Sequence, residues 1–178
     1  GVCNRIPEAE GWIVGPAVED PAYARECEEL FASLGLSEQV KFLGFQKVDE
    51  ILPKLGLMVL TSISEAQPLV LLEGYASGLP AIATDVGSCR EIIEGGSAED
   101  GALGSAGAVV SIANPDATAE AALALLKDEQ RWRLAQQAGI RRVTKFYTQR
   151  SMLDSYRVTY RDAIQSVSQP SGARLREA

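Results

Sequence analysis

A regular alternation of short apolar runs with longer amphipathic segments limits the fold more than any other feature of the chain. The runs are hydrophobic at nearly every position, which is typical of strands covered on both faces. The segments between them are long enough to be the helical crossovers that parallel strands require. The predicted strands are residues 11–15, 40–43, 57–60, 81–84 and 108–110, and the predicted helices are residues 21–34, 48–55, 68–77, 88–94, 116–127, 129–147 and 149–166. The predicted fold class is α/β, a doubly wound, Rossmann-like parallel sheet.

The length of 178 residues suits one domain, which we expect over residues 1–166, with a disordered tail over residues 167–178. Gly1 to Pro7 carry no signal-peptide pattern, and we expect a truncated chain. Ligands of doubly wound sheets bind beyond the carboxyl ends of the strands. Function is therefore expected in the turns that follow Gly15, Phe42, Leu60 and Thr84.

Composition excludes several kinds of chemistry. The chain has no histidine, and its three cysteines lie far apart, which argues against a zinc site and against Ser-His-Asp or Cys-His catalysis by this chain alone. An odd number of scattered cysteines favours reduced thiols and a cytoplasmic location. A formal net charge of -7 argues against a nucleic-acid partner. The late cations are expected on the solvated side of a helix; they are Arg131, Arg133, Arg141, Arg142 and Lys145.

The turn after the third predicted strand carries the strongest chemical signal. Pro68 is expected at the first helical position, where its missing N–H costs nothing. The free amides of Leu69 and Val70 then point out of the helix N-terminus beside Glu65, as a site for a phosphate or a sugar hydroxyl. Ser62 and Glu65 have the spacing of a capping box, but a helix starting there would enclose Pro68, so we reject that interpretation.

Glu73 lies further along the same helix, among residues that are apolar almost all the way round. This pattern predicts a buried helix, in which a carboxylate needs a partner. The structural alternatives are an ion pair with an arginine or a place on an exposed edge.

Two other turns carry weaker signals. Ser88 and Glu91 match a capping box, and Gly87 would let the backbone approach a ligand closely. Gly44, Phe45 and Gln46 follow the second strand and would clasp a flat base.

Together these residues resemble a known family. Residues 64–80 resemble the glutamate-x7-glutamate segment of family 4 retaining glycosyltransferases, which have the GT-B fold, and residues 42–45 and 84–87 resemble its flanking loops. The similarity runs from Trp12 to Tyr147 and corresponds to the C-terminal, donor-binding half of that fold. It is strongest to the branch that builds bacterial exopolysaccharides, although Ala66-Gln67-Pro68 replaces the small residues usual in the family.

The resemblance implies roles for single residues. Glu65 would lie near the donor sugar and the reacting carbon, and Glu73 would hold the ribose hydroxyls. The main chain of Ala66, Gln67, Pro68, Leu69 and Val70 would contact sugar and diphosphate, and the base would sit against Gly44, Phe45 and Gln46. The donor implied is UDP-glucose, with no metal, since no Asp-x-Asp is present.

The resemblance also implies what lies outside these residues: an N-terminal acceptor domain, and a first strand and helix whose Arg and Lys grip the diphosphate. A membrane polysaccharide-synthesis complex is a further implied partner. We therefore expect weak donor binding and no measurable transfer by this chain alone.

Other functions remain to be weighed. A non-catalytic nucleotide-binding or interaction module of the same fold is the main alternative. A dinucleotide dehydrogenase lacks its Gly-x-Gly-x-x-Gly turn, and a P-loop enzyme lacks its Gly-Lys-Ser/Thr ending.

Overall fold

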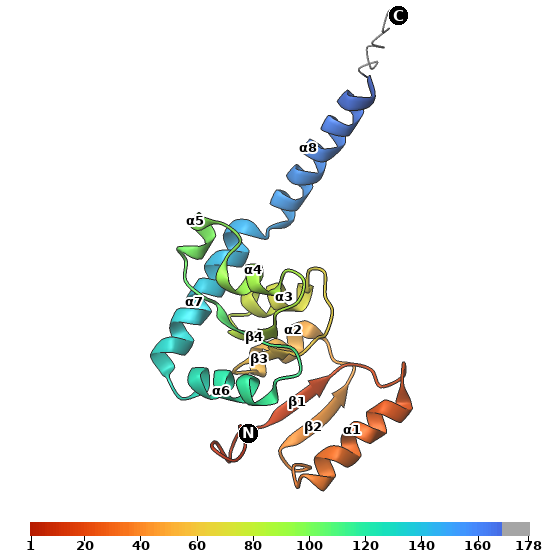
Figure 1. Ribbon diagram of the computed structural model, residues 1–178, viewed down its shortest axis with the longest axis vertical. Helices are drawn as coiled ribbons and strands as arrows, with labels where there is room; N and C mark the ends of the chain where they lie inside the picture. The colour runs from red at the N-terminus through yellow and green to blue at the C-terminus, as the bar shows by residue number, and fades with distance from the viewer. Residues whose placement is uncertain (169–178) are drawn as a thin grey trace, which may run out of the picture.

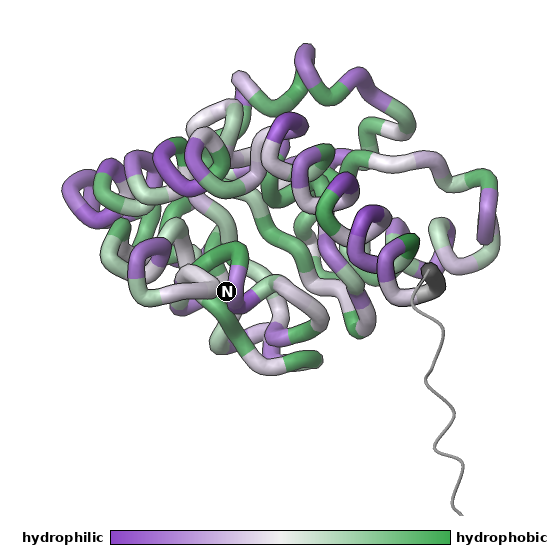
Figure 2. The backbone as a smooth tube through the Cα atoms, turned by 90° about the horizontal axis from the view of Figure 1, so that it is seen from above, coloured by the Kyte–Doolittle hydropathy of each residue, from purple (hydrophilic) through white to green (hydrophobic). Residues whose placement is uncertain are grey.

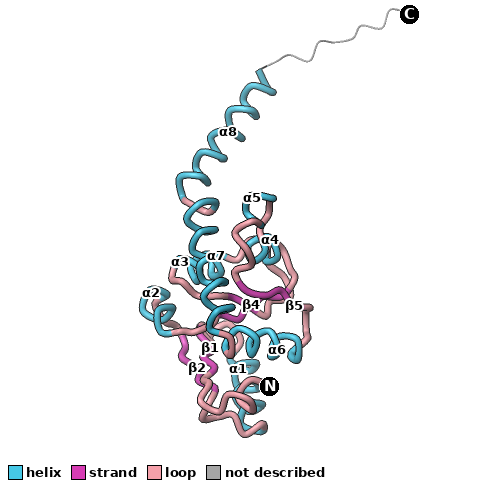
Figure 3. The backbone as a smooth tube through the Cα atoms, turned by 90° about the vertical axis from the view of Figure 1, so that its left-hand side faces the viewer, coloured by secondary structure: helices cyan, strands magenta, loops and turns pink. Residues whose placement is uncertain are grey.

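The computed structural model describes residues 1–168, which form short strands joined by helices (Figure 1; Figure 3). In chain order the elements are β1 (Gly11–Val14), α1 (Pro21–Ser33), β2 (Val40–Gly44), α2 (Val48–Ile51), the 3-10 turn η1 (Leu52–Lys54), β3 (Met58–Leu60), α3 (Leu69–Ala76), β4 (Ala81–Thr84), α4 (Cys89–Glu94), α5 (Ala98–Gly101), β5 (Gly107–Val110), α6 (Pro115–Leu126), α7 (Glu129–Phe146) and α8 (Gln149–Ser168).

The strand pairings are all parallel, which confirms the predicted α/β class. They fall into two hydrogen-bonded groups, β1-β2 and β3-β4-β5. Strands β1 and β3 are not paired with each other, so each is an edge strand. The carboxyl ends of β3 and β4 lie at one edge of their sheet because the strands are parallel neighbours, with Leu60 opposite Ala83.

Strand β4 is the centre of the core, and helices cover it on both faces. Ala81 and Ala83 belong to the cluster formed by α3, α4 and α7, whereas Ile82 packs with α6 on the opposite face. The alternation follows from the period of two along a strand. Figure 2 shows the hydrophobic strands running through the middle of the molecule. A third cluster, around Ile51, Leu52 and Leu79, joins β1 and β2 to this body through Trp12 and Leu43.

Local sequence signals set most helix boundaries. The side chains of Asp20, Asn114 and Asp128 each accept a hydrogen bond from a backbone amide three residues on, at 2.9–3.0 Å. Pro53 falls in the predicted helix 48–55, which the structure divides into α2 and η1. Helix α5 was not predicted: its cap is Ser97, whose hydroxyl accepts from the amide of Asp100 at 3.2 Å.

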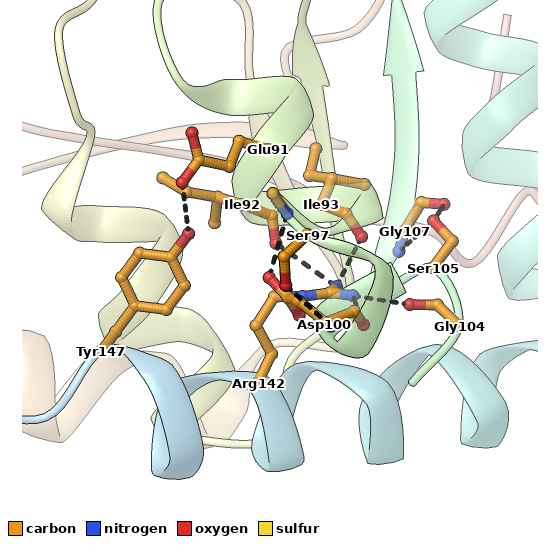
Figure 4. A network of polar contacts seen from close by, with 11 residues as sticks. Glu91, Ile92, Ile93, Ser97, Asp100, Gly104, Ser105, Gly107, Arg142 and Tyr147 are labelled. Carbon is orange, nitrogen blue, oxygen red and sulfur yellow. Dashed lines mark hydrogen bonds and ion pairs between the residues drawn. The ribbon is translucent and has the colours of Figure 1, made fainter. Parts of the chain in front are cut away.

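The prediction that Arg142 lies on a solvated face is wrong. Its side chain is fully buried and forms an ion pair with the buried Asp100, with Nε 2.5 Å from Oδ1. Its other nitrogens donate to the carbonyls of Ile93 at 2.7 Å and Gly104 at 2.8 Å (Figure 4). Arg142 therefore ties α7 to the end of α4 and to the loop before β5, and these hydrogen bonds offset the cost of burying its charge.

Helix α8 leaves the body of the molecule (Figure 1), and its side chains from Met152 to Ser166 are exposed. It matches the predicted helix 149–166 and continues to Ser168, two residues into the predicted tail. The rest of that tail, residues 169–178, lies outside the described residues. Within residues 1–168, no helix combines the length and apolarity needed to cross a bilayer.

The Arg142 network predicts an asymmetry between neighbouring arginines. Replacing Arg142 by Ala leaves the Asp100 carboxylate buried without its partner, and we expect a loss of about 3–5 kcal/mol in the free energy of unfolding. The exposed Arg141 is the matched control, and Arg141→Ala is expected to stay within about 0.5 kcal/mol. Urea unfolding of the two variants measures this difference, and equal small losses would contradict the structural role of Arg142.

Candidate functional site

Two turns meet at the carboxyl edge of the β3-β4-β5 sheet: the β3–α3 turn (residues 61–68) and the β4–α4 turn (residues 85–88). The amide of Ser88 donates to the carbonyl of Ala66 at 2.9 Å. The hydroxyl of Thr84, a buried residue, donates to the carbonyl of Ser62. The β3–α3 turn is therefore held by the strand beside it as well as by its own ends.

Gly87 permits this contact. It has φ +51°, in the left-handed region that favours glycine. A Cβ atom here would overlap the carbonyl oxygen of Glu65 and lie 2.6 Å from that of Ala66. The close approach that the structure shows at Gly87 is to the β3–α3 turn, and the approach of a ligand to its backbone stays a prediction.

The N-terminus of α3 opens beside this turn. Pro68 is the N-cap, in an extended conformation, and not the first helical residue as predicted. The amide of Leu71 donates to the carbonyl of Pro68 at 3.2 Å. The amides of Leu69 and Val70 have no partner among the described residues, so the two free donors predicted for this helix end are present.

Glu65 lies half-buried in the β3–α3 turn, and the hydroxyl of Ser62 donates to its Oε1 at 2.7 Å. In a capping box the Ser hydroxyl would instead accept from a backbone amide. The helix begins only at Leu69, so rejection of a capping box here is confirmed. Neither Ser62 nor Thr84 was predicted as a site residue; a hydroxyl at the end of an otherwise apolar strand was the available signal for Thr84.

Glu73 is exposed, so its predicted burial is wrong and the alternative of a place on an exposed edge of the helix is confirmed. Only one face of α3 is buried, through Leu71, Gly74 and Tyr75. Glu73 lies one turn after Leu69 on the other face, where the Leu69 side chain is 65% exposed. The Glu73 carboxylate forms no ion pair within residues 1–168, so an ion pair with an arginine is excluded as the explanation for it.

The predicted base-binding residues lie on the other sheet. Gly44 ends β2 with φ +61°, and the Phe45 side chain after it is 78% exposed. The Gln46 side chain donates to the carbonyl of Leu43 at 2.7 Å, so it closes the turn. Across the described chain, no hydrogen bond joins this turn to the segment from Glu65 to Glu73.

The β4–α4 turn differs from its prediction. Ser88 is the N-cap of α4, but its hydroxyl makes no capping hydrogen bond and is buried without a partner among the described residues, so the predicted capping box with Glu91 is wrong. Arg90 donates to Asp85 at 2.7 Å and to Glu94 at 3.0 Å. The hydrogen bonds that the Arg90 guanidinium donates to the Asp85 carboxylate lower the pKa of Asp85 below its ordinary value.

The contact between the two turns predicts a strong effect at Gly87. In Gly87→Ala, the methyl group both opposes the left-handed backbone and forces the β3–α3 turn away. Gly35 is the matched control, since it has φ +69° with nothing within 4 Å of a Cβ. We expect Gly35→Ala to cost about 1–2 kcal/mol from backbone strain alone and Gly87→Ala to cost clearly more. Chemical denaturation measures the free energy of unfolding of both variants. Equal losses would contradict the contact between Gly87 and the β3–α3 turn.

The comparisons with known proteins agree with this architecture. The profile of the family "Glycosyl transferases group 1" matches residues 2–128, and the chain belongs to this family. It is 31% identical over 137 residues to N-acetyl-alpha-D-glucosaminyl L-malate synthase of Bacillus anthracis. That match covers 76% of this chain and 34% of the relative, so the chain spans about a third of its length.

Two solved structures share the fold. One is the C-terminal domain of the group 1 glycosyl transferase LpcC from Francisella tularensis, with 25% identity and a TM-score of 0.70, covering 83% of this chain and 74% of that one. The other is HepE from Anabaena in complex with UDP-glucose, with 22% identity and a TM-score of 0.67, covering 82% and 40%. These similarities confirm the predicted fold, which is the Rossmann-like half of a GT-B fold.

Proposed function

We propose that this chain is the donor-binding part of a retaining glycosyltransferase. The observation that carries the proposal is the N-terminus of α3, where the amides of Leu69 and Val70, which lie along the chain between Glu65 and Glu73, have no partner among the described residues. The helix dipole and free N–H groups attract an anion, and the carboxylates accept hydrogen bonds from sugar hydroxyls. Membership of the family makes a nucleotide-sugar the ligand that combines both chemistries.

Each candidate residue has a role in this proposal. Glu65 is the catalytic candidate and faces the donor sugar, and the main chain of residues 66–70 contacts sugar and diphosphate. Glu73 holds the ribose hydroxyls, a role that suits its exposed and unpaired carboxylate. Negative charge grows on the departing diphosphate during transfer, and amides already aimed at that charge stabilise it.

The donor we propose is UDP-glucose, bound without a metal ion. HepE, which shares the fold, was solved with UDP-glucose. The segment from Ser64 to Leu72 also resembles PelF, the cytosolic glycosyltransferase of bacterial Pel exopolysaccharide synthesis, which supports glucose transfer to a growing polysaccharide in the cytoplasm, within a membrane-associated complex.

The exposed apolar face at this end of α3 supports a further part of the proposal. Ile63, Leu69 and Val70 are 79%, 65% and 37% exposed. Apolar side chains gathered beside a polar site are typical of a surface that another part covers. We propose that an acceptor domain covers it, and accordingly that these 178 residues bind the donor weakly and transfer no sugar alone.

The division of the sheet supports a missing strand. In the doubly wound order 3-2-1-4-5-6, the first strand lies where the order of strands reverses. The observed groups β2-β1 and β3-β4-β5 correspond to strands 3-2 and 4-5-6 of that order. We propose that a further parallel strand lies between β1 and β3 in the complete donor domain and brings the basic residues for the diphosphate.

Titration of UDP against the wild-type chain and Glu73→Ala tests the function. Loss of the hydrogen bonds between the carboxylate and the ribose is expected to raise the Kd for UDP by about tenfold or more. Glu28→Ala is the matched control, since Glu28 is an exposed helical glutamate in α1.

The main alternative, a non-catalytic nucleotide-binding or interaction module, predicts a different result. Equal UDP affinity in the wild type and Glu73→Ala would favour that alternative, and no UDP binding by the wild type would exclude the proposed donor site.

A further inference from the structure

The β3–α3 turn contains a chain of hydrogen bonds that starts in the core and ends on the Glu65 carboxylate. The hydroxyl of Thr84 donates to the carbonyl of Ser62, and the hydroxyl of Ser62 donates to Glu65 Oε1 at 2.7 Å. Thr84 is 2% exposed and lies in the fully buried strand β4. The Ser62 carbonyl thus accepts a hydrogen bond from the core, while the Ser62 hydroxyl donates one to Glu65 on the solvent side.

The geometry points to Ser62 and Thr84 as positioning residues that orient the Glu65 carboxylate toward the donor sugar. This inference deepens the proposed function and rests on it. Neither residue touches the donor in this arrangement; Ser62 acts through Glu65, and Thr84 acts through Ser62.

The first reason concerns the entropy of the glutamate side chain. A free glutamate side chain loses rotamer entropy when it is fixed, and this loss opposes binding. A charge-assisted hydrogen bond from Ser62 fixes the Glu65 side chain before the sugar arrives, so less of that cost falls on binding. The turn itself must be rigid for this to work, and the bonds from Thr84 and from the Ser88 amide supply that rigidity.

The second reason concerns the Glu65 carboxylate oxygen that Ser62 leaves without a hydrogen bond. A carboxylate has two acceptor oxygens, and Ser62 occupies only Oε1. No other side chain of the described residues donates to Glu65, and no cation pairs with it. Oε2 is therefore open to a sugar hydroxyl, and the negative charge stays unneutralised. A lysine or arginine in place of Ser62 would also orient the carboxylate but would cancel its charge.

The third reason is that local structure does not require the Ser62–Glu65 bond. Ser62 and Glu65 lie seven and four residues before Leu69, where α3 begins, and neither side chain caps a helix. Ser64, the other serine of the turn, is exposed and makes no hydrogen bond among the described residues, which shows that the turn does not need every hydroxyl it carries.

The test compares the Kd values of UDP-glucose and UDP for the 178-residue chain. Only UDP-glucose carries the sugar that Glu65 faces in the proposed site. In Ser62→Ala we expect the Kd for UDP-glucose to rise about tenfold while the Kd for UDP stays within about twofold. Ser62→Thr keeps the hydroxyl and is expected to restore UDP-glucose binding. Ser64→Ala is the matched control and is expected to change neither Kd.

Thr84 is tested in the same way with variants of similar size. Thr84→Val removes the hydroxyl and nearly preserves the volume, so we expect it to weaken UDP-glucose binding selectively, and Thr84→Ser is expected to retain it. Thermal unfolding by circular dichroism shows that each variant is folded.

The outcomes separate the two proposals. An equal rise in the Kd for UDP and for UDP-glucose in Ser62→Ala would show that Ser62 has only a structural role. That result would overturn the inference but would not contradict the proposed donor site. Unchanged binding of both ligands would also overturn it. A wild-type chain that binds neither ligand would remove the donor site, and the positioning role with it.

Discussion

The contact between the β3–α3 turn and the β4–α4 turn is the constraint on which the site depends. A buried threonine at the end of the central strand and a left-handed glycine in the turn that follows it bring the two turns together. Backbone carbonyls of the β3–α3 turn then find their donors in its neighbour instead of in water. Glu65 is consequently carried by the most buried strand of the core, although the turn itself lies at the surface.

The electrostatics of the site follow from what surrounds this contact. The chain has a net charge of -7, and a nucleotide-sugar is itself an anion. Arg90 is the cation of the neighbouring turn and helix, and it is already paired with Asp85 and Glu94. In the proposed donor site, the α3 amides are thus the positive end offered to the diphosphate. Such a site suits weak binding, in keeping with the proposal that a further strand brings the basic residues for the diphosphate.

Much of the fold was predictable because apolar strands and capped helices are local patterns. The wrong predictions of burial, at Arg142 and Glu73, come from judging a side chain by residue types and not by its position on the helix. Arg142 follows Ala135 and Ala138 at helical spacing, so it belongs to the buried stripe of α7. Its charge suggested solvent, whereas the carbonyls that satisfy that charge lie in α4 and before β5, about 40 residues or more away.

Glu73 shows the opposite error. Its apolar neighbours suggested burial, yet Leu71, Gly74 and Tyr75 alone form the buried face of α3. The sequence could identify the free amides of Leu69 and Val70, since they depend on local order around Pro68, whereas the role of Glu65 stays a prediction. It could not identify Ser62 and Thr84 as partners, because 22 residues separate them and only the pairing of β3 with β4 brings them together.

Nuclear magnetic resonance of the labelled chain during titration with UDP-glucose tests the central claim most directly, since each backbone amide reports separately. The proposed donor site predicts that the largest shifts fall on the amides of residues 65–67 and of Leu69 and Val70, with smaller ones on residues 44–46. Shifts confined to α7 or α8, or none at saturating ligand, would contradict it.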